Sequence, residues 1–284
     1  MIGDEFLRHF RLCDEEDSGL SDEEQKRKGP KNRPKHTRKR IHQNEKNFLE
    51  KFKTVSKFAA QFTKHISRQM KTYQTYLFDF DYTLADSSKG IVMCYRNVLE
   101  RHHHTGISDE AIKRTIGKTL VESFSLLSGI TDADTLEAYR KEYVKEADKY
   151  MTANTHLFPE TSHVLATLKA RGAKLGIIST KYRYRIMELL GHALPESTVD
   201  LIVGGEDVQT PKPSPEGVFI ALEKLQTEKT DVLYVGDSTV DAETARAAGI
   251  DFAGVLHGTT TREELAAYPH TGIMNDLTAL LKNE

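Results

Sequence analysis

A chain of 284 residues is long enough for one or two domains with a substantial hydrophobic core. Its formal net charge of −2 provides no overall attraction to nucleic acid or to a membrane surface, and its two cysteines, Cys13 and Cys94, form no metal or redox motif. No apolar run approaches the roughly 18 residues of a membrane-spanning helix, and the N-terminus is acidic where a signal peptide is basic, so we expect a cytoplasmic protein.

The first 69 residues differ in composition from the rest of the chain. Acidic residues between positions 14 and 24 precede a basic, proline-containing run at 26–40. Such a segment cannot bury enough apolar surface to offset chain entropy, so we expect residues 1–69 to be largely disordered and dispensable for catalysis. Phenylalanines at helical spacing within 48–62 predict one amphipathic helix there. The basic run has no interleaved aromatic residues, which favours a solvated tail over a nucleic-acid-binding arm.

From Tyr73 onward, short apolar strands alternate with helices. We expect strands within 75–80, 174–180, 199–205, 231–237 and 251–256, with helices at about 160–171, from about 215, and through 241–249. This alternation predicts an α/β fold with a doubly wound, Rossmann-like parallel sheet. The block 88–153 is helical throughout, so we interpret it as an all-helical cap domain inserted between residues 70–87 and 154–284 of a catalytic core.

Polar side chains follow the ends of the predicted strands. Because ligands of doubly wound sheets bind beyond the carboxyl ends of the strands, we expect these side chains to meet at one site. The residues concerned are Asp79, Asp81, Ser179, Thr180, Lys212, Asp237 and Asp241.

Clustered carboxylates repel one another unless a divalent cation neutralises them, and a few hard oxygen ligands favour Mg²⁺. A lysine and a hydroxyl beside that ion can hold the oxygens of a phosphoryl group. One aspartate can attack phosphorus, and a second can protonate the leaving oxygen and then activate water. The pattern therefore indicates phosphoryl transfer.

Four motifs in this chain resemble those of the haloacid dehalogenase superfamily, in order and in spacing: DFDYT, IIST, the lysine of TPKPSP, and GDSTVD. The resemblance covers about residues 72–284. The cap position, between the first two motifs, is similar to that of the phosphoglycolate phosphatase-like subfamily, which also includes pyrophosphatases and β-phosphoglucomutase. One departure is Tyr82, where the family usually has glycine, so the turn after Asp81 must accept a side chain.

The resemblance implies a role for each motif residue. Asp79 is the nucleophile and a magnesium ligand, and Asp81 is the general acid and base, whose backbone carbonyl also binds the metal. Ser179 hydrogen-bonds the phosphoryl group, Lys212 neutralises the charge of the nucleophile and the phosphate, and Asp237 binds magnesium.

Other residues have supporting or alternative roles. The resemblance also implies that Asp241 supports the metal through water or hydrogen bonds and that Thr83 braces the loop after the nucleophile. Thr180 and, in the cap, Lys118 are candidates for substrate binding, although Thr180 could instead cap a helix and Lys118 could lie in a surface turn. For Lys181 we expect a solvated helix face, with direct substrate contact as the alternative.

The implied activity is magnesium-dependent hydrolysis of a small phosphomonoester, phosphoglycolate-like, through an aspartyl-phosphate intermediate. The partner is then a small phosphorylated metabolite. A phosphosugar mutase of the β-phosphoglucomutase type, or a pyrophosphatase, remains as an alternative with the same catalytic groups. The sequence does not identify the substrate or the oligomeric state.

Overall fold

The computed structural model describes residues 72–282 and, before them, residue 53 alone. The expectations of disorder in 1–69 and of an amphipathic helix in 48–62 concern residues that, apart from that one, lie outside the described range. Among the helices described, none is both long enough and apolar enough to cross a bilayer.

Six parallel strands form the central sheet of the described region, in the order β5-β4-β1-β6-β7-β8. The chain leaves β1 toward β4 and β5 on one side and later returns to β6 on its other side, so the strand order reverses at β1. Ligand sites of doubly wound sheets lie at such a switch point. The strands are β1 Thr75–Phe78, β4 Lys174–Ile178, β5 Leu201–Val203, β6 Val232–Gly236, β7 Asp251–Val255 and β8 Gly272–Met274.

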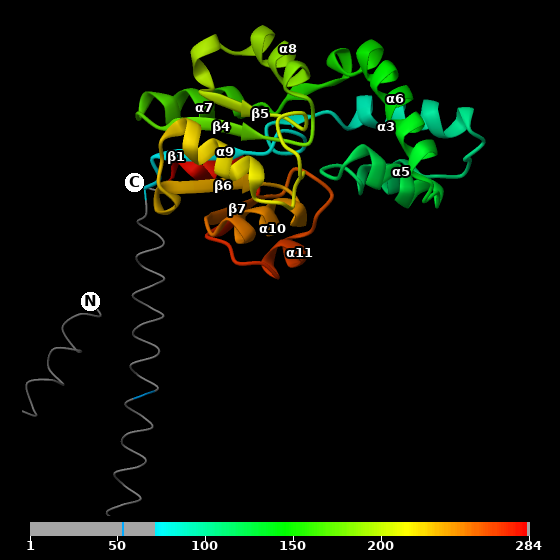
Figure 1. Cartoon of the computed structure of the whole chain (residues 1–284). Helices are drawn as coiled ribbons and strands as arrows, with labels where there is room; N and C mark the ends of the chain where they lie inside the picture. The colour runs from blue at the N-terminus through cyan, green and yellow to red at the C-terminus, as the bar shows by residue number, and fades with distance from the viewer. Residues whose placement is uncertain (1–52, 54–71, 283–284) are drawn as a thin grey trace, which may run out of the picture. The chain divides into compact units, whose positions relative to one another are not determined.

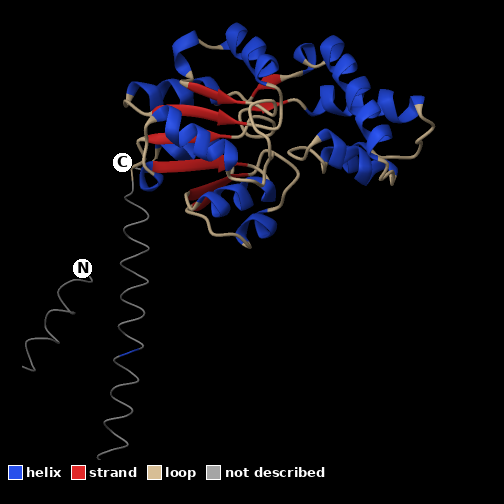
Figure 2. Ribbon diagram, viewed as in Figure 1, coloured by secondary structure: helices blue, strands red, loops and turns tan. Residues whose placement is uncertain are grey.

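Helices cover both faces of this sheet (Figure 2). In β1, Tyr76 and Phe78 pack on one face while Leu77 packs on the other, because successive side chains of a strand point in opposite directions. The first face packs against α7 Thr161–Ala170, α8 Arg183–Ala193 and the short helix η4 Leu277–Leu281. The second packs against α9 Glu216–Leu225, α10 Thr239–Ala248 and α11 Arg262–Ala266.

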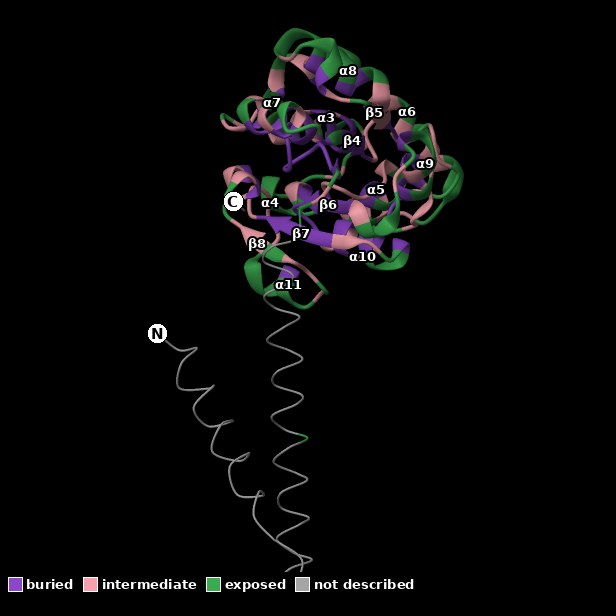
Figure 3. Cartoon of the chain, turned by 90° about the vertical axis from the view of Figure 1, so that its left-hand side faces the viewer, coloured by how far each residue is buried: buried purple, intermediate pink, exposed green. Residues whose placement is uncertain are grey.

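This arrangement confirms the predicted doubly wound α/β fold. Each of the five expected strands is present, whereas β8 was not expected, since three residues that begin with glycine carry little strand signal. Figure 3 shows the strands largely buried and the outward surfaces of the helices exposed.

The helical insertion has a core of its own. Its aromatic rings meet at Tyr95, whose ring centroid lies 4.7 Å from those of Phe124 and Tyr143. A two-stranded antiparallel neck, β2 Ala85–Asp86 and β3 His156–Leu157, joins the insertion to the sheet. We propose that the cap begins and ends at this neck, near the expected boundaries at 88 and 153. Its helices are α3 Ser88–Arg101, α4 Asp109–Lys113, α5 Leu120–Ser128, α6 Ala133–Tyr150 and η1 Thr152–Asn154.

The cap lies beyond the carboxyl ends of the strands, whose arrowheads in Figure 2 point toward it (Figures 1 and 2). The polar residues that follow the strands therefore lie between the sheet and the cap helices.

Candidate active site

The loop after β1 carries Asp79 and Asp81. Asp79 extends the sheet by one residue, because its N–H donates to the carbonyl of Val235 in β6 at 2.9 Å. The chain then turns sharply, and Tyr82 adopts φ = +59°, in the left-handed region that favours glycine. The ring of Tyr82 is buried, so its packing offsets part of this backbone strain. The turn thus accepts the side chain that departs from the family pattern.

Lys212 lies between two of the candidate carboxylates. Its Nζ is 2.9 Å from Oδ1 of Asp79 and 2.7 Å from Oδ1 of Asp241, and all three side chains are at most 4% exposed. Burial opposes the charge of this lysine, but the carboxylates of Asp241 and Asp79 outweigh that effect and raise its pKa well above the usual value. Lys212 is therefore a fixed cation beside the proposed nucleophile.

The positive charge beside Asp79 and Asp237 is too small to balance the negative charge of their carboxylates. Burial raises the pKa of Asp79 to about 7, and the neighbouring Asp241 and Asp81 add to the shift while Lys212 opposes it. Burial, with Asp241 and Asp79, also raises the pKa of Asp237 well above its usual range. Carboxylate oxygens of Asp79, Asp237 and Asp241 lie within 4.8 Å of one another. A cluster of carboxylate oxygens that repel one another fits a hard divalent cation such as Mg²⁺, which binds oxygen ligands.

Asp241 has partners for both of its oxygens. Oδ2 accepts hydrogen bonds from the Ser238 N–H (3.1 Å) and Oγ (2.6 Å), forming the capping box that starts α10. Oδ1 accepts from Lys212 and, at 3.2 Å, from the hydroxyl of Tyr234. Asp241 thus connects the start of α10 to Lys212 and positions that lysine.

Asp237 is confined by two neighbouring loops. The Thr83 hydroxyl, in the loop after the proposed nucleophile, donates to its Oδ1 at 3.3 Å. After β7, Gly258 comes so close that a Cβ atom there would lie 2.0 Å from Oδ2 of Asp237. Gly258 could not be identified from the sequence, because nothing in the local sequence HGTT indicates which residue packs against it.

Ser179 and Thr180 follow β4. Ser179 is buried, and its N–H donates to the carbonyl of Val203 at 3.0 Å, which continues the pairing of β4 with β5. The alternative role of Thr180 as a helix cap was wrong, because α8 begins at Arg183 and its N-terminal capping residue is Tyr182.

The expectation of a solvated helix face for Lys181 was also wrong. Lys181 lies in the loop before α8, its side chain is 8% exposed, and its Nζ is 3.0 Å from Oδ1 of Asp81. The loop directs this side chain back over the strand ends rather than outward. The cation of Lys181 is therefore part of the site.

Comparison with known proteins agrees with this geometry. The family model of haloacid dehalogenase-like hydrolases matches residues 76–255, which include all the residues of the cluster. This chain belongs to the haloacid dehalogenase-like hydrolases.

Its relatives include named phosphatases. The pyrophosphatase PpaX of Bacillus pumilus is 32% identical over 74% of this chain and 95% of its own length. The phosphoglycolate phosphatase of Aquifex aeolicus is also 32% identical, over 64% of this chain and 84% of its own length. A crystal structure described as a haloacid dehalogenase-like hydrolase of Bacteroides fragilis is 59% identical, covers 74% of this chain and 100% of that chain, and has a TM-score of 0.73.

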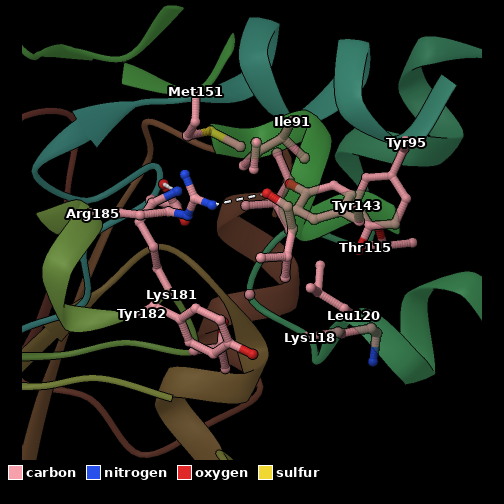
Figure 4. Close-up of a pocket in the computed structure, with 16 residues that line it drawn as sticks. Ile91, Tyr95, Thr115, Lys118, Leu120, Tyr143, Met151, Lys181, Tyr182 and Arg185 are labelled. Atoms are coloured by element: carbon pink, nitrogen blue, oxygen red, sulfur yellow. Dashed lines mark hydrogen bonds and ion pairs between the residues drawn. The ribbon is translucent and has the colours of Figure 1, made fainter. Parts of the chain in front are cut away.

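A pocket separates the sheet of this hydrolase from its cap (Figure 4). Asp81, Thr180 and Lys181 line it from the sheet side, and Lys118 lines it from the cap. The structure thus brings both candidate substrate-binding residues to the same pocket. The Nζ of Lys118 also pairs with Glu122 at 2.7 Å, one helical turn along.

Two sets of polar contacts join the cap to the sheet domain. Arg185 of α8 donates to the carbonyl of Val144 (3.1 Å) and to Asp148 (2.6 Å) in α6. Arg114 of the cap pairs with Glu264 of α11 at 3.2 Å. These contacts join residues far apart in the sequence, so the sequence motifs do not indicate them.

Proposed function

We propose that this chain is a magnesium-dependent phosphatase that hydrolyses a small phosphomonoester through an aspartyl-phosphate on Asp79. The observation that carries the proposal is the buried arrangement of Asp79 between Lys212 and Asp237, at the switch point of the sheet. A nucleophilic carboxylate, a fixed cation and a second metal-binding carboxylate are the groups that phosphoryl transfer to an aspartate requires.

Magnesium would be held by the carboxylates of Asp79 and Asp237 and by the backbone carbonyl of Asp81, with Asp241 in support. When bound, the ion supplies positive charge that allows a phosphate dianion to approach a carboxylate nucleophile. The fit rests on the carboxylate cluster and on the upward pKa shifts of Asp79 and Asp237.

In the first step, a carboxylate oxygen of Asp79 forms a bond to phosphorus while the ester P–O bond breaks. Asp81, in its protonated form, gives its proton to the departing oxygen, so the alcohol leaves neutral. In the second step, Asp81 takes a proton from water as the water oxygen attacks phosphorus. The acyl–phosphate P–O bond breaks, which releases inorganic phosphate and restores the Asp79 carboxylate.

Ser179 and Lys212 would hold the phosphoryl oxygens during both steps. Thr180 and Lys118 would contact the remainder of the substrate, since both line the pocket that Asp81 also lines. The substrate would be a small phosphorylated metabolite in the cytoplasm. Because one set of relatives is named pyrophosphatase, pyrophosphate stays a second candidate substrate.

The test is release of inorganic phosphate from p-nitrophenyl phosphate by the full chain. We expect turnover with Mg²⁺, loss of turnover with EDTA, and recovery when Mg²⁺ is added back. Asp79→Asn should abolish turnover and covalent labelling without unfolding the protein, because an amide is a poor nucleophile. Full activity in metal-free buffer, or normal turnover by Asp79→Asn, would contradict the proposal. A requirement for a sugar bisphosphate activator would instead indicate a mutase.

A further inference from the structure

The pocket in Figure 4 lies on the leaving-group side of the proposed reaction. Asp81, which would protonate the leaving oxygen, is part of its lining, whereas Asp79 is not. A phosphoryl group bound at Asp79 therefore places the rest of its substrate in this pocket. Its lining comes from both the sheet domain and the cap, so a substrate in it would contact both.

The cap wall of the pocket is largely apolar. Tyr95 and Tyr143 are buried, and burial raises the pKa values of both phenols, so neither presents a charge. Figure 4 also shows the aliphatic side chains of Ile91 and Leu120 and the thioether of Met151 among the residues that line the pocket. The apolar lining consists of Ile91, Tyr95, Ile116, Leu120, Tyr143, Val144, Ala147 and Met151.

Each cation that lines the pocket already has an anionic partner. Lys118 pairs with Glu122 at 2.7 Å, and Lys181 pairs with Asp81 at 3.0 Å. Arg185 pairs with Asp148 at 2.6 Å. An anionic leaving group would have to compete with these carboxylates for a cation, or else lose its hydration against an apolar wall without a counter-charge. The second option is costly for an ion.

Because the cations of the pocket already pair with carboxylates and its cap wall is apolar, we propose that the substrate is a phosphomonoester of an uncharged, apolar alcohol. The alcohol is branched or contains a ring, and the substrate is neither phosphoglycolate nor pyrophosphate. The inference rests on the phosphatase activity proposed above and narrows its substrate class, away from the phosphoglycolate-like substrate that the sequence resemblance implies. The apolar body of the alcohol packs against the cap wall while its ester oxygen stays near Asp81.

The test measures kcat/KM for the hydrolysis of two substrates of matched size by the full chain in the presence of Mg²⁺. Isobutyl phosphate and phosphoglycolate both carry the ester oxygen on a CH₂ group, followed by a branched three-atom group that is neutral in one and a carboxylate in the other. We expect kcat/KM for isobutyl phosphate to exceed that for phosphoglycolate by about tenfold or more, because a mismatch in an apolar pocket gives discrimination of that order. Cyclohexylmethyl phosphate should be better still, and pyrophosphate should be poor.

A variant outside the pocket tests the role of the paired cations. Glu122→Gln removes the carboxylate partner of Lys118 and adds nothing to the pocket lining. It should raise kcat/KM for phosphoglycolate by about two- to fivefold, the range that a partly exposed ion pair supports, and leave isobutyl phosphate unchanged. Glu100→Gln, which removes a carboxylate that pairs with Arg96 one helical turn away in the cap and does not line the pocket, is the matched control and should change neither value.

The outcomes separate the two proposals. If phosphoglycolate or pyrophosphate is hydrolysed as well as isobutyl phosphate or better, the apolar substrate class is wrong and the phosphatase proposal stands. If Glu122→Gln does not raise kcat/KM for phosphoglycolate, the argument from paired cations is wrong. If the protein hydrolyses none of these esters, nor p-nitrophenyl phosphate, in the presence of Mg²⁺, the phosphatase proposal is wrong. The narrower inference about the substrate class is then wrong as well.

Discussion

The ammonium group of Lys181 lies 3.0 Å from Oδ1 of Asp81, and the two side chains are only 8% and 11% exposed. The pair joins the loop after β4 to the loop after β1. It places a positive charge beside the residue that we propose as general acid and base, so its removal should affect the proton-transfer steps directly.

Lys181→Met tests this pair. We expect kcat with p-nitrophenyl phosphate to fall by about ten- to a hundredfold, because the variant leaves the buried Asp81 carboxylate without its cation and a positioned acid–base group contributes about 10²–10⁴ in rate. Lys181→Arg should recover part of the loss. The control is Lys169→Met, which removes the exposed partner of Asp200 far from the site. Equal activity of Lys181→Met and Lys169→Met would show that the pair is only structural.

Gly258 provides a test of the proposed metal site. A Cβ atom at this position would lie 2.0 Å from Oδ2 of Asp237, so Gly258→Ala must displace that carboxylate or the loop after β7. We expect the magnesium concentration for half-maximal activity to rise by about ten- to a hundredfold, as for other changes that move a metal ligand. Gly272→Ala is the matched control, because no atom lies within 4 Å of a Cβ there. An unchanged magnesium requirement in Gly258→Ala would argue against Asp237 as a ligand.

Lys118 tests the contribution of the cap. Since its side chain lines the pocket, Lys118→Ala should lower kcat/KM for the best phosphomonoester of a substrate panel far more than for p-nitrophenyl phosphate. Lys113→Ala serves as the control, because Lys113 has a similar exposed fraction and pairs with Glu110 but does not line the pocket. Equal losses for both substrates in Lys118→Ala would mean that Lys118 lies in a surface turn without substrate contact.

The raised pKa of Asp79 predicts how stability depends on pH. The value is about 7, against an ordinary 3.8, so between these pH values the metal-free folded protein binds a proton that the unfolded chain has released. The stability gained from that proton is complete below the unfolded pKa and is lost as the pH rises through the folded pKa. We therefore expect the Tm of the metal-free protein to decrease as the pH rises from about 5 to about 7.5.

Magnesium should replace the missing proton, and thus raise the Tm more at about pH 7.5 than at about pH 5. Asp79→Asn, measured by thermal unfolding in the same buffers, should show a smaller pH slope and a smaller effect of magnesium. If magnesium shifts the Tm equally at both pH values, proton and metal do not compete for this cluster.

The sequence by itself determined the strand ends and the residues that follow them. Short apolar runs identified β1, β4, β5, β6 and β7, and Asp79, Ser179 and Asp237 are one residue beyond their strands. Parallel strands in one sheet bring such residues to the same edge, so their meeting could be predicted without coordinates. The helical insertion followed from helical periodicity within 88–153 and from the absence of a strand pattern there.

Only the tertiary structure decided which side chains close the site from elsewhere. Lys181 reaches Asp81 because its loop turns back before α8 begins, and Gly258 reaches Asp237 because the loop after β7 crosses the strand end. The pairing of Arg185 with Asp148 depends on how α8 packs against the cap helix α6. Such contacts connect residues that are tens of positions apart, and their geometry is set by the packing of whole elements. Local spacing in a sequence carries no information about that packing.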